Sequence, residues 1–192
     1  MREIIAKSAR KNDPTDTDWK VNRAGYNINH KYGFGTIHAQ NALTTASSWT
    51  KISSDYISYS TPLTQIIYPI PDNNSTGATQ TITVSGSGIN KIEYIEIYFY
   101  TNHSYLGDLT ITLKNGTTNT QSILYEKHTC RDSSGNKANC ENYSTGEKSI
   151  RLGSARHLGE SSNATWTITA KDTSASDTGS FRAYLVFRGR AN

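Results

Sequence analysis

Apolar and polar residues alternate along four stretches of the chain, all of them beyond residue 90. In the last stretch, apolar side chains occupy every odd-numbered position from Phe181 to Phe187. The other three stretches cover residues 94–99, 109–113 and 166–170. Alternation with a period of two is typical of strands that bury one face.

Turn signals rich in Asn, Asp and Gly accompany these stretches. They lie at residues 72–74, 86–88, 115–116 and 134–136. Between the alternating stretches we find no helical periodicity. Many short strands separated by such turns predict a mainly β fold, either a sandwich or a barrel.

The first fifty residues follow a different pattern. Ile4 and Ile5 belong to a short helical pattern, and residues 39–49 carry a second one with apolar positions three and four apart. Two short helices bury too little surface to fold alone, so this part is expected to need a partner. We therefore divide the chain into residues 1–50 and residues 51–192.

Length and charge narrow the possible classes of protein. The 192 residues suit one sizeable domain, or one domain with an appendage. The 20 basic residues exceed the 16 acidic ones by only four and are scattered, so the dense basic patch of a nucleic-acid binder is missing. No apolar run approaches the roughly 18 residues of a membrane span. Residues 1–10 lack the apolar stretch of a signal peptide.

The two cysteines, Cys130 and Cys140, flank nine mostly polar or small residues. This spacing favours a disulfide at the base of a loop, formed in an oxidising compartment. Two free surface thiols are the alternative. A zinc site at the cysteines is not indicated, because no pair of histidines lies nearby in the sequence.

The acidic residues offer one candidate metal site. Asp172 and Asp177 flank the short loop 173–176, where carboxylate and carbonyl oxygens could hold Ca²⁺. The alternative is a solvated turn. No other cofactor is indicated. Asp108 is expected to accept backbone N–H groups in a turn, and Glu160 to do the same or to pair with Arg156.

The first fifty residues also contain motifs of a known family. Asp18 to Gly25 resembles its W-x-x-N-x-A-G motif, and His30 to Ala39 resembles H-x-Y-G-F-G-x-x-x-A. The most specific part of the match is the turn formed by Tyr32, Gly33, Phe34 and Gly35. This stretch resembles the end of the catalytic domain of a kexin/furin-type subtilase.

The remainder resembles the P domain (P/Homo B domain) that follows the catalytic domain in those proteases. Thr101 to Leu113 matches T-H-x-x-x-G-D-L-x-I-x-L, and His157 to Glu160 matches H-W-G-E with Leu158 in place of Trp. The matching positions are Gly107, Asp108, Leu109, Gly159, Glu160 and Trp166. The resemblance implies a jelly-roll-like β-sandwich, with these residues in structural roles.

The same resemblance bears on catalysis. Subtilases use an Asp–His–Ser triad with an oxyanion-hole Asn, and their Gly-Thr-Ser motif does not occur here. The chain is therefore expected to begin after the nucleophile and to be inactive alone. Its five histidines are expected to be structural or exposed. The parent protein would be a serine endopeptidase that is secreted or held at the cell surface or in the periplasm.

Two functions remain in competition. The first is an accessory P domain that stabilises and modulates a catalytic domain in the same polypeptide. The second is a free-standing β-sandwich that binds glycans or proteins through exposed tyrosines. Tyr94, Tyr98 and Tyr100 share one strand face and could stack on a ligand, although we favour cross-strand packing as their role. We favour the accessory domain, because a binding module has no use for the subtilase-like residues 1–50.

Overall fold

The computed structural model describes residues 1–138 and 146–192. Its helical elements are α1 (Arg2–Ser8), α2 (Ala39–Ser47) and the short 3₁₀ helix η1 (Leu106–Asp108). The short strands are β1 (Lys20–Val21), β2 (Asn27–Ile28), β3 (Ile57–Ser60), β4 (Tyr68–Ile70), β9 (Cys130–Arg131) and β10 (Lys137–Ala138). The longer strands are β5 (Asn74–Thr83), β6 (Lys91–Thr101), β7 (Leu109–Asn115), β8 (Gln121–Tyr125), β11 (Lys148–Ser154), β12 (Thr165–Asp172) and β13 (Gly179–Arg190).

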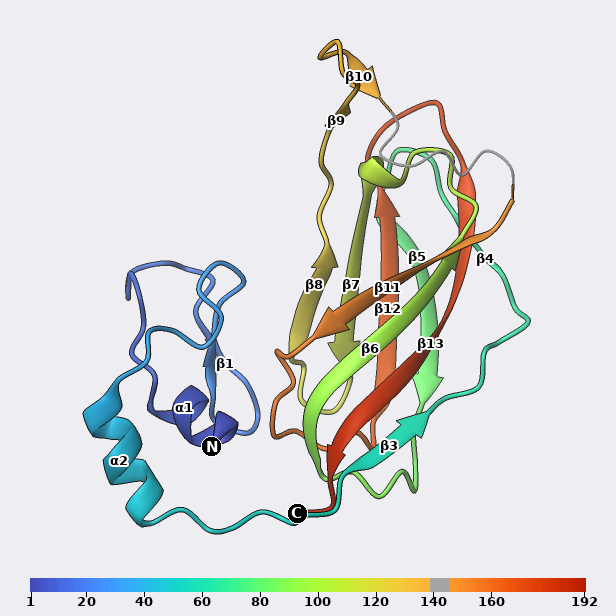
Figure 1. Ribbon diagram of the computed structural model, residues 1–192. Coiled ribbons are helices and arrows are strands. Elements are labelled where there is room, and N and C mark those ends of the chain that lie inside the picture. The colour runs from blue at the N-terminus through green and yellow to red at the C-terminus, as the bar shows by residue number, and fades with distance from the viewer. Residues whose placement is uncertain (139–145) are drawn as a thin grey trace.

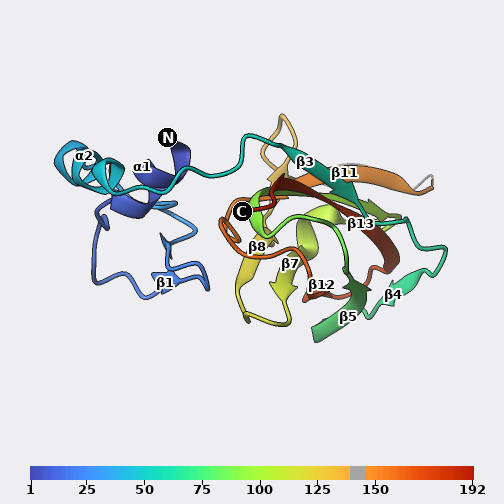
Figure 2. The same cartoon turned by 90° about the horizontal axis from the view of Figure 1, so that it is seen from below.

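Two antiparallel sheets face each other and form a sandwich (Figures 1 and 2). The first sheet has the strand order β11-β6-β13-β3, and β4 also pairs with β13. The second sheet has the order β5-β12-β7-β8. This arrangement confirms the mainly β fold that the alternating sequence predicted.

The core lies between the two sheets and contains the apolar positions of the four alternating stretches. Phe99 of β6 stacks on Phe181 of β13, with ring centroids 4.9 Å apart. Trp166 of β12 is fully buried, and its indole Nε1 donates to the Ser162 carbonyl at 2.8 Å. Burial of these side chains is the main source of stability for a domain of this size.

The central strand β13 changes partner along one side, where β4 pairs with its start and β3 with its end. Between these two pairings, backbone amide and carbonyl groups of β13 form hydrogen bonds with residues that lie outside the neighbouring strands. Buried Gln80 accepts from the Ala183 amide at 2.8 Å and donates to its carbonyl at 2.7 Å. Thr61 pairs with Leu185 through its hydroxyl oxygen, which accepts from the Leu185 amide at 3.0 Å, and its own backbone amide, which donates to the Leu185 carbonyl at 2.9 Å. The gap therefore leaves these buried backbone groups paired.

The N-terminal segment, residues 1–50, lies beside one end of the sandwich (Figures 1 and 2). Helix α1 buries Glu3 and Ala6, and Ala6 packs with Tyr26 and with Leu158 of the sandwich. Helix α2 contacts α1 but buries none of its own residues, and Leu43 is 69% exposed. Among the described residues, no helix is long and apolar enough to span a membrane.

Candidate functional site

The N-terminal segment meets the sandwich at the loop that connects β11 to β12. We call this contact, between residues 18–30 and residues 156–160, the joint. Asn22 is its central side chain and is only 4% exposed. Its Nδ2 donates to the carbonyls of Arg156 at 3.1 Å and Leu158 at 2.9 Å, and its Oδ1 accepts from the Tyr26 amide at 3.0 Å. The buried side chain of Asn22 therefore makes hydrogen bonds both to the β11–β12 loop and within the N-terminal segment.

Glu160 forms the second part of the joint. Its buried carboxylate accepts from the Arg23 amide at 3.0 Å, which ties the N-terminal segment to the sandwich. Four side chains of the sandwich also contact this carboxylate, namely Asn115, Thr118, Thr120 and His157. Burial raises the pKa of Glu160, but the bonds from His157, Thr120 and Arg23 outweigh it and leave the pKa below its usual value.

Arg156 lies on the other side of the joint and faces Asp18 and His30 instead of Glu160. Its guanidinium is 3.6 Å from the Asp18 carboxylate and 3.1 Å from His30 Nδ1. The ring of His30 bridges the two parts, because Nδ1 lies 3.0 Å from Asp18 and Nε2 accepts from the Ile123 amide at 2.9 Å. With Nε2 held by a backbone amide, this Asp–His pair is not arranged to activate a nucleophile.

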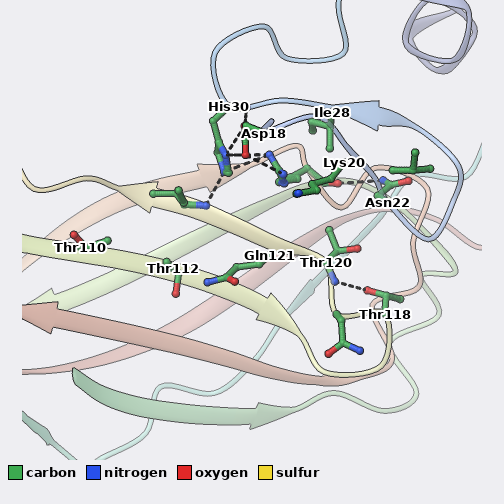
Figure 3. Close-up of a pocket in the computed structure, with 14 residues that line it drawn as sticks. Asp18, Lys20, Asn22, Ile28, His30, Thr110, Thr112, Thr118, Thr120 and Gln121 are labelled. Atoms are coloured by element: carbon green, nitrogen blue, oxygen red, sulfur yellow. Dashed lines mark hydrogen bonds and ion pairs between the residues drawn. The ribbon is translucent and has the colours of Figure 1, made fainter. Parts of the chain in front are cut away.

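A groove of about 490 Å³ runs beside the joint, between the N-terminal segment and the outer face of β7 and β8. Figure 3 shows Asp18 and His30 on one wall and a row of threonines with Gln121 on the other. The threonines are Thr110, Thr112, Thr118 and Thr120. Their wall presents neutral hydroxyl and amide groups, whereas the charges of the groove come mainly from Asp18, Lys20 and Arg156.

A second buried polar cluster lies at the other end of the sandwich, near η1 and the end of β12 (Figure 1). Asp172 and Asp177 come together there, and the fold adds His103. His103 Nε2 lies 3.4 Å from Asp172 Oδ2 and 3.5 Å from Asp177 Oδ1. Burial, together with Asp172 and Asp108, raises the pKa of Asp177 to about 7. The candidate calcium site expected from the sequence contained both aspartates, and it did not include the histidine.

Two glycines of the family-like motifs, Gly35 and Gly159, occupy positions that demand glycine. Gly159 has a φ of +76°, and a Cβ there would lie 2.9 Å from Tyr26. Gly35 has a φ of +108° and lies against the backbone of Arg10. Tyr32 stacks on Trp19, with ring centroids 6.1 Å apart.

The other predicted residues lie near η1 of the sandwich and in the N-terminal segment. Gly107 and Asp108 form the end of η1, and Leu109 begins β7 with a fully buried side chain. Phe34 packs edge-on against Tyr26, with ring centroids 6.0 Å apart.

Cys130 begins β9. Cys140 lies outside the described residues. The disulfide therefore stays a prediction.

The tyrosine row on β6 packs across strands. Tyr98 stacks on Tyr184 of β13 with centroids 4.7 Å apart and planes 2° from parallel. Tyr100 lies 6.3 Å from the same ring, and Arg151 covers the other side of Tyr98 at 5.8 Å. These contacts are the cross-strand pairs that stabilise a sheet, so the stacking faces of Tyr98 are already occupied.

Comparison with known proteins points to one family. The family model described as the proprotein convertase P-domain matches residues 92–186. Proprotein convertase subtilisin/kexin type 6 of Rattus norvegicus is 26% identical over 121 residues, which cover 59% of this chain and 12% of that protein. The PC3-like endoprotease variant B of Hydra vulgaris is 36% identical over 52 residues, covering 27% of this chain and 7% of that protein. The chain thus spans a small fraction of these relatives.

A solved structure shares the fold over nearly the whole chain. The serine protease of Aeromonas sobria, in complex with its chaperone, superposes with a TM-score of 0.79 at 19% identity. The match covers 98% of this chain and 39% of that protease chain. It therefore includes the N-terminal segment as well as the sandwich.

Proposed function

We propose that the chain is a non-catalytic P-domain fragment of a subtilisin-like serine endopeptidase, because residues 92–186 match the model of the proprotein convertase P-domain. In this proposal, residues 51–192 form the P domain. The N-terminal segment is the end of the catalytic domain. The P domain stabilises that catalytic domain and modulates its proteolysis of peptide bonds.

The joint is the observation that carries the stabilising role. Asn22 and Glu160 are buried, and each makes hydrogen bonds to both sides of the contact. An intramolecular hydrogen bond contributes about 0.5–1.5 kcal/mol net relative to bonds with water. Separating the two parts would exchange several such bonds for bonds to water, so the sandwich favours the ordered form of the segment. A contact made only in the folded state stabilises that state.

The exposed apolar side chains of the N-terminal segment support its assignment to a larger body. Val21 is 64% exposed, Ile37 66% and Leu43 69%. Helix α2, which carries Leu43, buries none of its residues. Apolar residues gathered on one segment favour contact with further protein. In this proposal, they pack against the remainder of the catalytic domain.

The histidine contacts support the proposal that this chain alone does not hydrolyse peptides. His30 is held by Asp18 and the Ile123 amide, and His38 caps α2 by accepting from the Asn41 amide. His157 lies against Glu160. A triad requires a serine hydroxyl within reach of a free imidazole nitrogen. We propose that the parent endopeptidase acts outside the cell or in the periplasm. The glycan-binding alternative loses support, because the tyrosine row is packed.

A labelling experiment tests this proposal. An antibody raised against this chain would be used on extracts and medium of the source organism after treatment with a serine-directed fluorophosphonate probe. We expect the antibody to detect a polypeptide much larger than 192 residues that carries the probe, whereas the purified chain carries none and does not digest casein. Detection of only the unlabelled 192-residue chain would contradict the proposal, as would stoichiometric labelling of a serine in the chain itself.

A further inference from the structure

We propose that His103, Asp172 and Asp177 form a zinc site that ties the two sheets together at the end of the sandwich remote from the joint. His103 follows β6 of the first sheet, and Asp172 ends β12 of the second sheet. Asp177 lies just before β13, which returns to the first sheet. This inference does not depend on the proposed function.

The distances between the three ligand atoms suit one small cation. His103 Nε2 is 3.4 Å from Asp172 Oδ2 and 3.5 Å from Asp177 Oδ1. All three atoms lie within 4.8 Å of one another. Zinc bonds of about 2.0–2.2 Å in tetrahedral geometry separate neighbouring ligand atoms by about 3.3–3.6 Å. The two separations from His103 therefore match those of a zinc site, and the two carboxylate oxygens are no more than 4.8 Å apart.

The electrostatics of the cluster require a positive species between these atoms. The side chains of His103 and Asp172 are fully buried, and that of Asp177 is 5% exposed. Within residues 1–138 and 146–192, His103 Nε2, Asp172 Oδ2 and Asp177 Oδ1 find no hydrogen-bond partner. Buried charges in proteins are paired or coordinate metals. Two buried carboxylate oxygens facing an imidazole nitrogen fulfil this rule when a cation or a proton lies among them.

The other ring nitrogen of His103 is held as in a metal ligand. Nδ1 lies 3.1 Å from the Tyr105 carbonyl, and a ligating histidine usually donates this N–H to such an acceptor. That tautomer directs the lone pair of Nε2 toward Asp172 and Asp177. The Tyr105 amide also faces Nδ1, at 3.3 Å. If Nδ1 instead accepts from that amide, the ring proton lies on Nε2, and this proton takes the place of the metal between the carboxylates. The experiment below distinguishes a bound metal from this proton.

The donor set favours Zn²⁺ over Ca²⁺. Calcium takes six to eight oxygen ligands, often including waters, whereas zinc accepts imidazole nitrogen with carboxylate oxygen in a closed four-coordinate site. His103, Asp172 and Asp177 would supply three of the four ligands that zinc takes, and Asp108 interacts with the Asp177 carboxyl beside them. A fully buried histidine with acidic neighbours therefore matches zinc and not the calcium that the two aspartates alone suggested.

The surroundings of the three residues hold them in place. The second oxygen of Asp172 accepts from the Ser174 amide at 2.8 Å, which orients the carboxylate. Gly179 lies directly against His103, and a Cβ at position 179 would come within 2.6 Å of the His103 Cβ. Supporting contacts of this kind orient metal ligands and tune their affinity.

The experiment measures metal binding by the whole chain. Because the site is buried, the chain is unfolded in urea with a chelator and refolded with Zn²⁺, with Ca²⁺ or with neither. After removal of free metal, mass spectrometry counts the bound ions. We expect one Zn²⁺ per chain, a higher melting temperature with Zn²⁺ than without, and, after refolding with Co²⁺, the visible absorption of a tetrahedral cobalt site.

Two variants and a control complete the design. Asp177→Asn and His103→Gln are each expected to weaken Zn²⁺ binding about a hundredfold. The control His128→Gln changes a histidine in an exposed contact and should retain full binding. Absence of bound Zn²⁺ in the folded wild-type chain would overturn the proposal and assign the cluster to a shared proton. One bound Ca²⁺ in its place would overturn the donor argument. Because the wild-type measurement decides, poor folding of a variant leaves the test intact.

Discussion

Replacing Glu160 by glutamine is expected to loosen the joint while leaving the core packing unchanged. Glutamine has nearly the same shape, but one carboxylate oxygen becomes an NH₂ group. The hydroxyls of Thr118 and Thr120 can rotate and accept from that group. The Arg23 amide cannot, because a backbone N–H only donates. With the NH₂ group in place of Oε1 the Arg23 amide loses its partner, and with it in place of Oε2 the Asn115 side-chain amide does, so either orientation leaves one donor unpaired.

The size of the effect follows from these contacts. An unpaired buried donor costs about 1–3 kcal/mol, and the remaining bonds lose the extra strength that a charged acceptor gives them. We expect E160Q to lower the free energy of unfolding by about 2–4 kcal/mol near pH 7. Glu147→Gln is the matched control. It breaks a surface pair with Arg182, in which the Glu147 side chain is 34% exposed, and should cost at most about 1 kcal/mol.

The pH dependence supplies a sharper test. The pKa of Glu160 lies below its usual value in the folded protein, since the hydrogen bonds that it accepts outweigh the opposing effect of burial. A depressed folded-state pKa contributes stability above the unfolded pKa of about 4.3, and this stability is lost as the pH falls through the folded pKa. Glutamine does not titrate. The difference between wild type and E160Q should therefore be full at neutral pH and should shrink below about pH 4.

Urea denaturation followed by circular dichroism at several pH values measures this difference. The same titration of Glu147→Gln provides the baseline for general effects of acid. A difference that stays constant from pH 7 to pH 3 would refute the view that the ionised carboxylate is the stabilising form. A difference below 1 kcal/mol at neutral pH would show that Glu160 is not central to the joint.

Three further predictions follow from the packing and the sequence. Gly179→Ala should lower stability by about 1–3 kcal/mol, because the new Cβ meets His103, whereas Gly153→Ala meets only the ring end of half-exposed Tyr94 and should cost under about 0.5 kcal/mol; thermal melts compare the two. Asn22→Ala should make residues 1–50 roughly thirtyfold more sensitive to limited proteolysis without changing amide exchange in the sandwich, and equal sensitivity would contradict the joint. Alkylation should modify neither cysteine before reduction and both afterwards, as mass spectrometry can show.

The alternating pattern predicted the four central strands of the sandwich and missed the strands at its edges. The four stretches became β6, β13, β12 and β7, each with a strand on both sides. The edge strand β5 has mostly exposed or half-buried residues, and β11 buries only its last residue. An edge strand contributes less to the core, so few of its positions must be apolar. The alternation of apolar and polar residues is therefore weakest in the edge strands, which bury the fewest side chains.

The joint could not be predicted from residue types, because its partners are far apart in sequence. Asn22 meets carbonyls 134 and 136 residues away, and these are backbone groups without any sequence signal. The resemblance to subtilases correctly indicated the family of residues 92–186. It assigned structural roles to Gly159 and Glu160 but did not show what either residue contacts.

The buried polar residues did leave a signal in the alternation itself. Inward positions of β12 are the even ones, and Asp172 continues them with a fully buried carboxyl. Inward positions of β6 and β13 are odd, and His103 and Asp177 continue that parity beyond the strand ends. Asn115 likewise continues β7 and reaches Glu160. A polar residue that extends an inward-facing series must find a partner, because burial without one is costly. When the inward-facing positions of several strands finish on a polar residue, those residues meet at an end of the sandwich and form a polar cluster there.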